Sequence, residues 1–362
     1  MVRILIVTPW FPTADAPHSG TFVAREAAAL ADEHEVRVLH LDWTGSADDE
    51  IPRGANHEIS RVLLRRTSPG AYRRAREIVT AASADTDIVH THALTLLLPW
   101  LRTRVTDLPW VHSEHWSGLT SPETLGRAER AALRVLRPAL DRPDVVIAES
   151  SRLAAAVAAS RTGPIELVPC IVPEHAVVDP PRATALRLIG IGGLIPRKGP
   201  LLAVQALGEL TRRGHDAELV WLGDGPLRDD VRREASRLGV DDRVDLAGAV
   251  PPSTVADRID AANMLLLPTQ GDNFCVVAAE ALSHGRPIVS GYRTGAVDYA
   301  DPSVSRMVEE QSGTAYADAV IDLWQSAGER SAAEVAATVA GRFTPRTVRT
   351  RLEQIYRSAG AV

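Results

Sequence analysis

The sequence predicts an α/β protein made of two Rossmann-like domains, each with a parallel sheet covered by helices. Short β-branched runs alternate with longer Ala/Arg/Glu-rich segments of helical period, the pattern of repeated β-α-β units. The alternation stops at a proline-rich segment near the middle of the chain and then restarts. Ligands of such sheets bind at the carboxyl ends of the strands. We therefore expect the site in the loops after the strands, in a deep cleft between the facing domains.

The first domain, residues 1–172, is predicted to begin with a buried strand and a helix. The strand is RILIV (3–7) and the helix is TFVAREAAALA (21–31). Further strands are predicted at EVRVLHL (35–41), DIVHTH (87–92), WVHSEH (110–115) and DVVIAES (144–150). The segment PCIVPEHAVVDPPRAT (169–184) is rich in proline and lacks periodicity, which indicates a linker.

The second domain, residues 173–342, repeats the alternation. Its predicted strands are LRLIGIGG, AELVWLGDG, RVDLAG, MLLLPT and PIVSG. The helices predicted between them are PLLAVQALGELTRRG, LRDDVRREASRLG, STVADRIDAA and VVAAEALSHG. A last helix within residues 343–362 is expected to pack back towards the first domain.

The composition is that of a globular protein in a reducing compartment. The chain is 45% hydrophobic and 24% charged with a net charge of −6, which does not indicate a nucleic-acid-binding protein. Cys170 and Cys275 are the only cysteines and argue against a disulfide framework. The start lacks a signal-peptide pattern, and the longest apolar run, ALTLLLPWL, is shorter than a membrane span. We expect a cytoplasmic bacterial protein, either a monomer or a homodimer.

Four positions are candidates for chemistry, each with a plainer alternative. Lys198, the only lysine in 362 residues, follows a predicted strand, although a lone lysine can be an accident. Gly20 precedes a helix start that can bind an anion or simply form a loop. His115 ends a strand, where it can donate to a sugar hydroxyl or be structural, as we expect for His90, His92 and His112. Glu280, eight residues after Asp272, can bind a vicinal diol or face solvent.

Other patterns are interpreted as structural. The acidic pair in DTD (85–87) precedes a strand and indicates a turn, not a metal site. GIGGL lacks the remaining features of a dinucleotide fingerprint, and GGLIPRKG is not a Walker A loop. An arginine cluster can contact an anionic membrane or a phosphorylated acceptor, or can form a solvated helix face. It comprises Arg61, Arg65, Arg66, Arg73, Arg74 and Arg76.

Taken together, the motifs resemble a glycosyltransferase of family 4, with the GT-B fold, over nearly the whole chain. PWFP…HSGTFVAREAAAL is similar to the family's first loop and helix, and DIVHTH, PWVHSEH and DVVIAES to its next strands. GGLIPRKG resembles G-R-L-x-x-x-K-G, and LGDGPLRDDV the G-x-G-P turn. VDLAGAVP resembles the base-contacting motif, and DNFCVVAAEALSHGRPIV the E-x7-E signature.

The resemblance implies a retaining transfer from a UDP- or GDP-sugar to a small-molecule or glycan-intermediate acceptor, without a cofactor or metal. The first domain would bind the acceptor and the second the nucleotide sugar. Lys198 would neutralise the leaving diphosphate, Glu280 would bind the ribose, and His115 would contact the donor sugar. Asp272 would hold sugar hydroxyls, with help from the backbone N–H groups of Phe274, Cys275 and Val276. Gly20 would lie under the phosphates, and residues 247–249, around Gly248, would meet the base.

The chain departs from the family pattern at three places, and the first two bear on the donor. Gly193 stands where the family has an arginine, a loss that Arg197 or an arginine of the first domain is expected to offset. Asp272 replaces the first glutamate of E-x7-E, and Asn273 and Cys275 replace glycines. Asn263 replaces an aspartate and is expected to be structural. Two alternatives therefore stay open: a nucleotide-sugar 2-epimerase of the same fold, and a pseudoenzyme that only binds nucleotide sugar.

Overall fold

The computed structural model describes residues 1–14, 16–43, 57–65, 68, 70–180, 185–328 and 330–361. The chain forms two compact units, one of residues 1–171 with 343–362 and the other of residues 172–342. Residues 181–184 of the predicted linker and Arg66 of the arginine cluster lie outside the described residues. Among the described helices, none combines the length and the apolar character that crossing a membrane requires.

Unit 1 contains a parallel seven-stranded sheet in the order β3-β2-β1-β4-β5-β6-β7. The central strands are buried on both faces by helices, which explains their continuous apolar runs. The strands are β1 (Arg3–Thr8), β2 (Glu35–Asp42), β3 (Glu58–Leu63), β4 (Ile88–His92), β5 (Trp110–Glu114), β6 (Val145–Ala148) and β7 (Ile165–Leu167).

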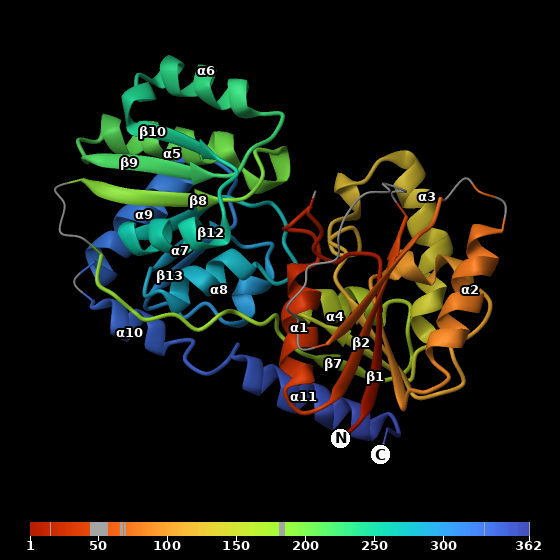
Figure 1. Cartoon of the computed structure of the whole chain (residues 1–362). Helices are drawn as coiled ribbons and strands as arrows, with labels where there is room; N and C mark the ends of the chain where they lie inside the picture. Colours follow the sequence, from red (N-terminus) through yellow and green to blue (C-terminus); the bar gives the residue numbers. More distant parts are fainter. Residues whose placement is uncertain are drawn as a thin grey trace. The chain divides into compact units, whose positions relative to one another are not determined.

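The longer helices of unit 1 are α1 (Thr21–Ala31), α2 (Ala71–Ala82), α3 (Arg127–Leu136), α4 (Ser151–Ala158) and α11 (Pro345–Ser358), and a 3-10 helix, η1, spans Leu94–Trp100. The last helix, α11, packs on α1, as Figure 1 shows in blue and red. Leu352, Ile355 and Tyr356 of α11 join the apolar cluster that contains Ile4 of β1 and Val23 of α1. These buried contacts make the C-terminal segment part of unit 1.

Unit 2 contains a parallel six-stranded sheet in the order β10-β9-β8-β11-β12-β13. The strands are β8 (Leu186–Ile191), β9 (Ala217–Leu222), β10 (Val244–Gly248), β11 (Met264–Leu267), β12 (Ile288–Gly291) and β13 (Ser305–Val308). Its helices are α5 (Pro200–Arg212), α6 (Arg228–Leu238), α7 (Pro252–Ala261), α8 (Val276–Ser283), α9 (Gly313–Ala327) and α10 (Ala332–Ala337). Asn263 accepts the Arg187 N–H through Oδ1 at 2.9 Å, which is a structural role.

The two-sheet fold class is confirmed, but the sequence missed some elements at the sheet edges. The edge strands β3, β7 and β13 carry polar or half-exposed residues, so their apolar signal is weak. The arginine cluster is accordingly not one helix face. Arg61 lies on β3, and its Nε donates to Oδ2 of Asp42 at 3.1 Å in a largely buried pair. Only Arg73, Arg74 and Arg76 of the described cluster residues lie on α2.

Candidate functional site

Two loops of unit 2, after β8 and after β11, come unusually close together. Gly199 has a left-handed φ of 69°, and a Cβ built on it would lie 2.1 Å from the Pro268 carbonyl oxygen. Only glycine fits this approach. The backbone carbonyl of Arg197 accepts the Gln270 N–H at 2.8 Å and the Thr269 hydroxyl at 3.1 Å. The loop that carries the only lysine is thereby fixed against the loop that carries Asp272.

Lys198 and Asp272, both predicted site residues, form an ion pair. Lys198 Nζ donates to Oδ2 of Asp272 at 2.6 Å, and the Cys275 N–H donates to Oδ1 at 2.9 Å. Burial by itself would raise the pKa of Asp272, but the nearby charges of Lys198 and Arg197 outweigh it and lower that pKa. The carboxylate is therefore ionised, and Lys198 keeps two further N–H donors for other acceptors.

A second cation stands beside this pair. Arg197 donates through Nη1 to the Gly271 carbonyl, and the same Nη1 lies 3.8 Å from Oδ2 of Asp272. Gly193, where an arginine was expected, is not forced to be glycine: a Cβ there would lie 3.6 Å from the Asp224 carbonyl oxygen. The structure thus places Arg197 in one charge cluster with Lys198 and Asp272, and its compensation for the missing arginine stays a prediction.

Helix α8 begins directly after this cluster. Cys275 is its N-cap with a left-handed φ of 65°, and the Tyr299 hydroxyl donates to its carbonyl at 2.7 Å. The Cys275 N–H was expected to assist sugar binding, but it is already used by the Asp272 carboxylate, because the tight turn folds the amide back onto that side chain. Asn273 and Phe274 are buried, Val276 is the first helical residue, and Glu280 follows one turn later.

The two remaining glycines of the prediction, Gly20 and Gly248, have left-handed backbones where a loop meets a helix or a strand. Gly20 has a φ of 63° at the N-terminus of α1, and a Cβ there would lie 2.2 Å from the Trp10 carbonyl oxygen. Gly248 has a φ of 77° at the end of β10, and its carbonyl accepts the Gly223 N–H at 2.8 Å. Both therefore shape turns that a side chain would strain, whatever ligand these turns meet.

His115 follows β5 in unit 1, and both of its ring nitrogens are engaged. Nδ1 lies 2.5 Å from Oε1 of Glu149, and Nε2 lies 3.0 Å from Nδ1 of His92. Burial lowers the pKa of His115, but the carboxylates of Glu149, Glu114 and Glu26 outweigh it and raise that pKa. A role for His115 on the donor sugar stays a prediction, and it requires one of these partners to release the ring.

The sequence reasoning missed the carboxylates around His115. Glu149 directly follows β6, and its Oε1 also accepts from the Cys170 thiol at 3.1 Å. Glu114 ends β5 and accepts the N–H groups of His115 and Trp116 at 2.9 and 2.7 Å. The available signal was a glutamate at the carboxyl end of a buried strand, where a charged side chain needs a partner.

Comparison with known proteins confirms the family that the sequence motifs resemble. The model for glycosyl transferases group 1 matches residues 185–326, and the model for glycosyltransferase family 4 matches residues 19–175. The chain belongs to glycosyltransferase family 4. This family 4 chain is 29% identical to the GDP-mannose-dependent alpha-(1-6)-phosphatidylinositol monomannoside mannosyltransferase of Mycobacterium tuberculosis, over 89% of each chain. It is 26% identical to the D-inositol 3-phosphate glycosyltransferase of Corynebacterium aurimucosum, over 100% of this chain and 89% of the relative.

Solved structures support the fold of this glycosyltransferase. Sucrose-phosphate synthase from Thermosynechococcus elongatus aligns with a TM-score of 0.81 at 19% identity, over 98% of each chain. The Anabaena protein HepE, in complex with UDP and glucose, aligns with a TM-score of 0.73 at 16% identity, over 99% of this chain and 100% of that one. At these identities the likeness concerns the fold alone, which is GT-B.

Proposed function

We propose that this glycosyltransferase moves a sugar from a nucleoside-diphosphate sugar to a small-molecule or glycan-intermediate acceptor, with retention and without a metal ion at the diphosphate. The observation that carries the proposal is the Lys198–Asp272 pair at the start of α8. It places one cation, with a second in Arg197, next to a helix N-terminus. Free N–H groups and the positive end of the helix dipole favour phosphate there.

Lys198 has the larger part in the chemistry of the leaving group. As the bond from the sugar C1 to the diphosphate oxygen breaks, negative charge grows on the diphosphate, and a fixed ammonium stabilises that charge. Asp272 orients Lys198 through Oδ2, and its remaining lone pairs can accept a sugar hydroxyl. Glu280, one turn into α8, is the residue proposed for the ribose diol.

The acceptor is activated by the same leaving group. In a front-face transfer the acceptor oxygen bonds to C1 on the side from which the diphosphate departs, and the acceptor proton passes to a diphosphate oxygen. This route needs no protein base, which agrees with a His115 whose ring nitrogens are both engaged. Unit 1 is proposed to bind the acceptor.

The relatives narrow the substrates to be tested first. One is named for GDP-mannose and a phosphatidylinositol mannoside, and another for inositol 3-phosphate. We therefore rank GDP-mannose as the first donor and inositol-containing acceptors as the first acceptors, with UDP-sugars next. Arg65, Arg73, Arg74 and Arg76 are exposed and are proposed for weak contact with an anionic membrane surface. Arg61 is excluded by its buried pair with Asp42.

A donor screen tests the proposal. The shift of the unfolding temperature with UDP, GDP, ADP and TDP selects the base, and donor-sugar panels with acceptor pools follow. Proton NMR of the product then reports whether the anomeric configuration is retained. Release of nucleoside diphosphate that needs no acceptor and yields an epimerised sugar would favour the 2-epimerase alternative. Donor binding without any turnover would favour the pseudoenzyme.

A further inference from the structure

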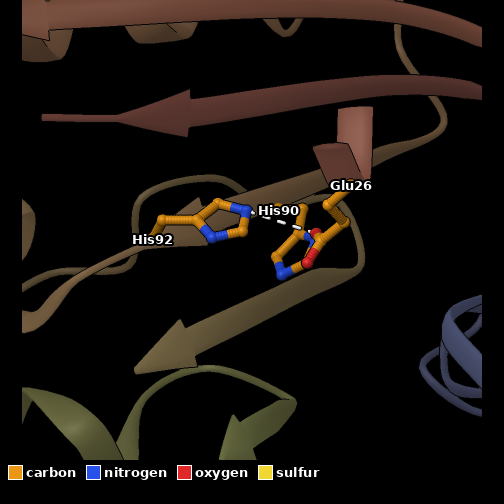
Figure 2. A group of neighbouring side chains, drawn as sticks. All are labelled: Glu26, His90 and His92. Carbon is orange, nitrogen blue, oxygen red and sulfur yellow. Dashed lines mark ion pairs between the residues drawn. The ribbon is translucent and has the colours of Figure 1, made fainter. Parts of the chain in front are cut away.

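A strand of unit 1 carries two buried histidines on one face. His90 and His92 are separated by one residue on β4, so both side chains point to the same side of the sheet. Glu26 of α1 meets them there, as Figure 2 shows. Both imidazoles are fully buried, and Glu26 is only 13% exposed. Two imidazoles and one carboxylate therefore share a small, largely dry space.

The contacts among these three side chains are not ordinary hydrogen bonds. Oε1 of Glu26 lies 3.3 Å from Nδ1 of His90 and 3.5 Å from Nε2 of His92. Oε1 of Glu26 and Nε2 of His92 are buried and make no hydrogen bond with the described part of the chain. Buried polar atoms of this kind are rare unless water, a ligand or an ion satisfies them.

We propose that Glu26, His90 and His92 form a binding site for one divalent metal ion of the zinc type. A tetrahedral zinc ion with ligands at about 2.0–2.1 Å separates its ligand atoms by about 3.3–3.4 Å. The two separations from Glu26 Oε1, 3.3 and 3.5 Å, are close to this spacing and long for hydrogen bonds, and all three candidate ligand atoms lie within 4.8 Å of one another. Two imidazoles and one carboxylate form a ligand set that zinc accepts, with the fourth position left for water or another oxygen.

The hydrogen-bond partners of both histidines are those expected for metal-coordinating side chains rather than for isolated core residues. His90 Nε2 lies 2.8 Å from the Ser113 hydroxyl, and His92 Nδ1 lies 3.0 Å from Nε2 of His115. In each ring, one nitrogen is therefore anchored away from Glu26, as in metal sites whose ligands are held by outer partners. The other nitrogen faces Glu26; in His92 it has no hydrogen-bond partner among the described residues, whereas in His90 it also contacts the Tyr356 hydroxyl. His115 is held in turn by Glu149, so an ion at this site would order the chain of side chains from Glu149 to His92.

Two neighbours define how the ion would enter and what it would displace. Glu26 and His115 line a small cavity with room for about one water molecule, which gives a path to the carboxylate. The Tyr356 hydroxyl lies 2.8 Å from His90 Nδ1 and must turn away, or join the ligands, when the ion binds.

A second cluster, in unit 2, supplies the control. His175 and His284 lie 2.9 and 2.7 Å from the two carboxylate oxygens of Asp260, so these contacts are ordinary hydrogen bonds. The guanidinium of Arg286 lies 3.9 Å from the same carboxylate and opposes a further cation. His175 is 33% exposed, so His175→Gln removes an imidazole with little effect on folding. We therefore expect the metal in the Glu26 cluster.

The test is metal stoichiometry in the full chain, produced without a histidine tag. The protein is stripped with a chelator, loaded with Zn²⁺, desalted and analysed by inductively coupled plasma mass spectrometry. We expect about one zinc per wild-type chain and per His175→Gln chain. Glu26→Gln and His92→Gln should lose that zinc and also the rise in unfolding temperature that zinc gives the wild type.

Cobalt loading of the wild type gives a result that depends on no variant. Four-coordinate Co²⁺ with nitrogen and oxygen ligands should give intense visible bands that excess Zn²⁺ removes. The proposal is overturned if the wild type retains no zinc, if Glu26→Gln and His92→Gln retain it, or if only His175→Gln loses it. None of these readouts involves a sugar donor, so they are independent of the proposed transfer reaction.

Discussion

Replacement of Lys198 by methionine tests the proposed site most directly. Methionine keeps most of the side-chain length and removes only the charge. A unit charge at about 4 Å from a phosphate oxygen, at the effective dielectric constant of about 20 that suits a partly exposed pair, contributes about 4 kcal/mol. Lys198 is 15% exposed and Asp272 is 22% exposed, which justifies that intermediate dielectric constant. We expect a loss of about a thousandfold in kcat/KM for the donor.

The variant also removes the main partner of Asp272. The pKa of Asp272 is lower in the folded chain than in the unfolded chain. Its ionised carboxylate therefore stabilises the fold at pH values above the unfolded-state pKa, and this stabilisation is lost as the pH falls through the folded-state pKa. Lys198→Met should therefore be less stable at pH 7 by about 1–3 kcal/mol, because Asp272 stays ionised with a weaker partner. The double variant Lys198→Met/Asp272→Asn also removes the buried negative charge of Asp272, so it should recover stability but not activity.

The assay combines turnover with thermal unfolding of all three proteins. Arg233→Met is the matched control, because Arg233 is 71% exposed in its pair with Asp230 on α6 and its loss changes the net charge equally. Wild-type turnover in Lys198→Met would refute the phosphate role. Recovery of activity together with stability in the double variant would show that Lys198 serves only the fold.

Three further predictions concern the surroundings of this pair. Glu280→Gln should weaken nucleoside-diphosphate binding by about tenfold or more, because a bidentate charged contact to the ribose is lost; unchanged affinity by calorimetry would remove Glu280 from the site. Gly199→Ala should destabilise the protein by about 2–4 kcal/mol, from left-handed strain and the clash with Pro268. Gly239→Ala has the same φ of 69° and open space, so its unfolding temperature should fall less, and equal falls would contradict the clash. Burial raises the pKa of Cys275 to about 12, so its thiol is protonated and inaccessible at pH 8. Iodoacetamide at that pH should leave Cys275 unmodified in the native chain and label it in denaturant, which peptide mass spectrometry measures. Labelling in the native chain would show that the start of α8 opens.

The sequence determined the alternation of strands and helices and therefore the two parallel sheets. Apolar runs such as Met264–Leu267 are buried on both faces of the sheet. A short, continuous apolar run in the sequence predicts a strand of this kind. The sequence also singled out Lys198 as the only lysine of the chain, and Asp272 with Glu280 by their spacing of eight residues, although their roles stay predictions. The edge strand β3 was not predicted, because its residues are half-exposed or exposed and do not form a continuous apolar run.

Only the tertiary structure decided which polar groups are partners. Lys198 and Asp272 are 74 residues apart and meet because Gly199 lets one loop lie against the Pro268 carbonyl. Glu26, His90 and His92 come from a helix and a strand more than 60 residues apart, and each residue alone reads as an ordinary helix or core residue. Contacts between distant segments depend on the packing of α1 against the sheet, and no local pattern of residue types encodes that packing.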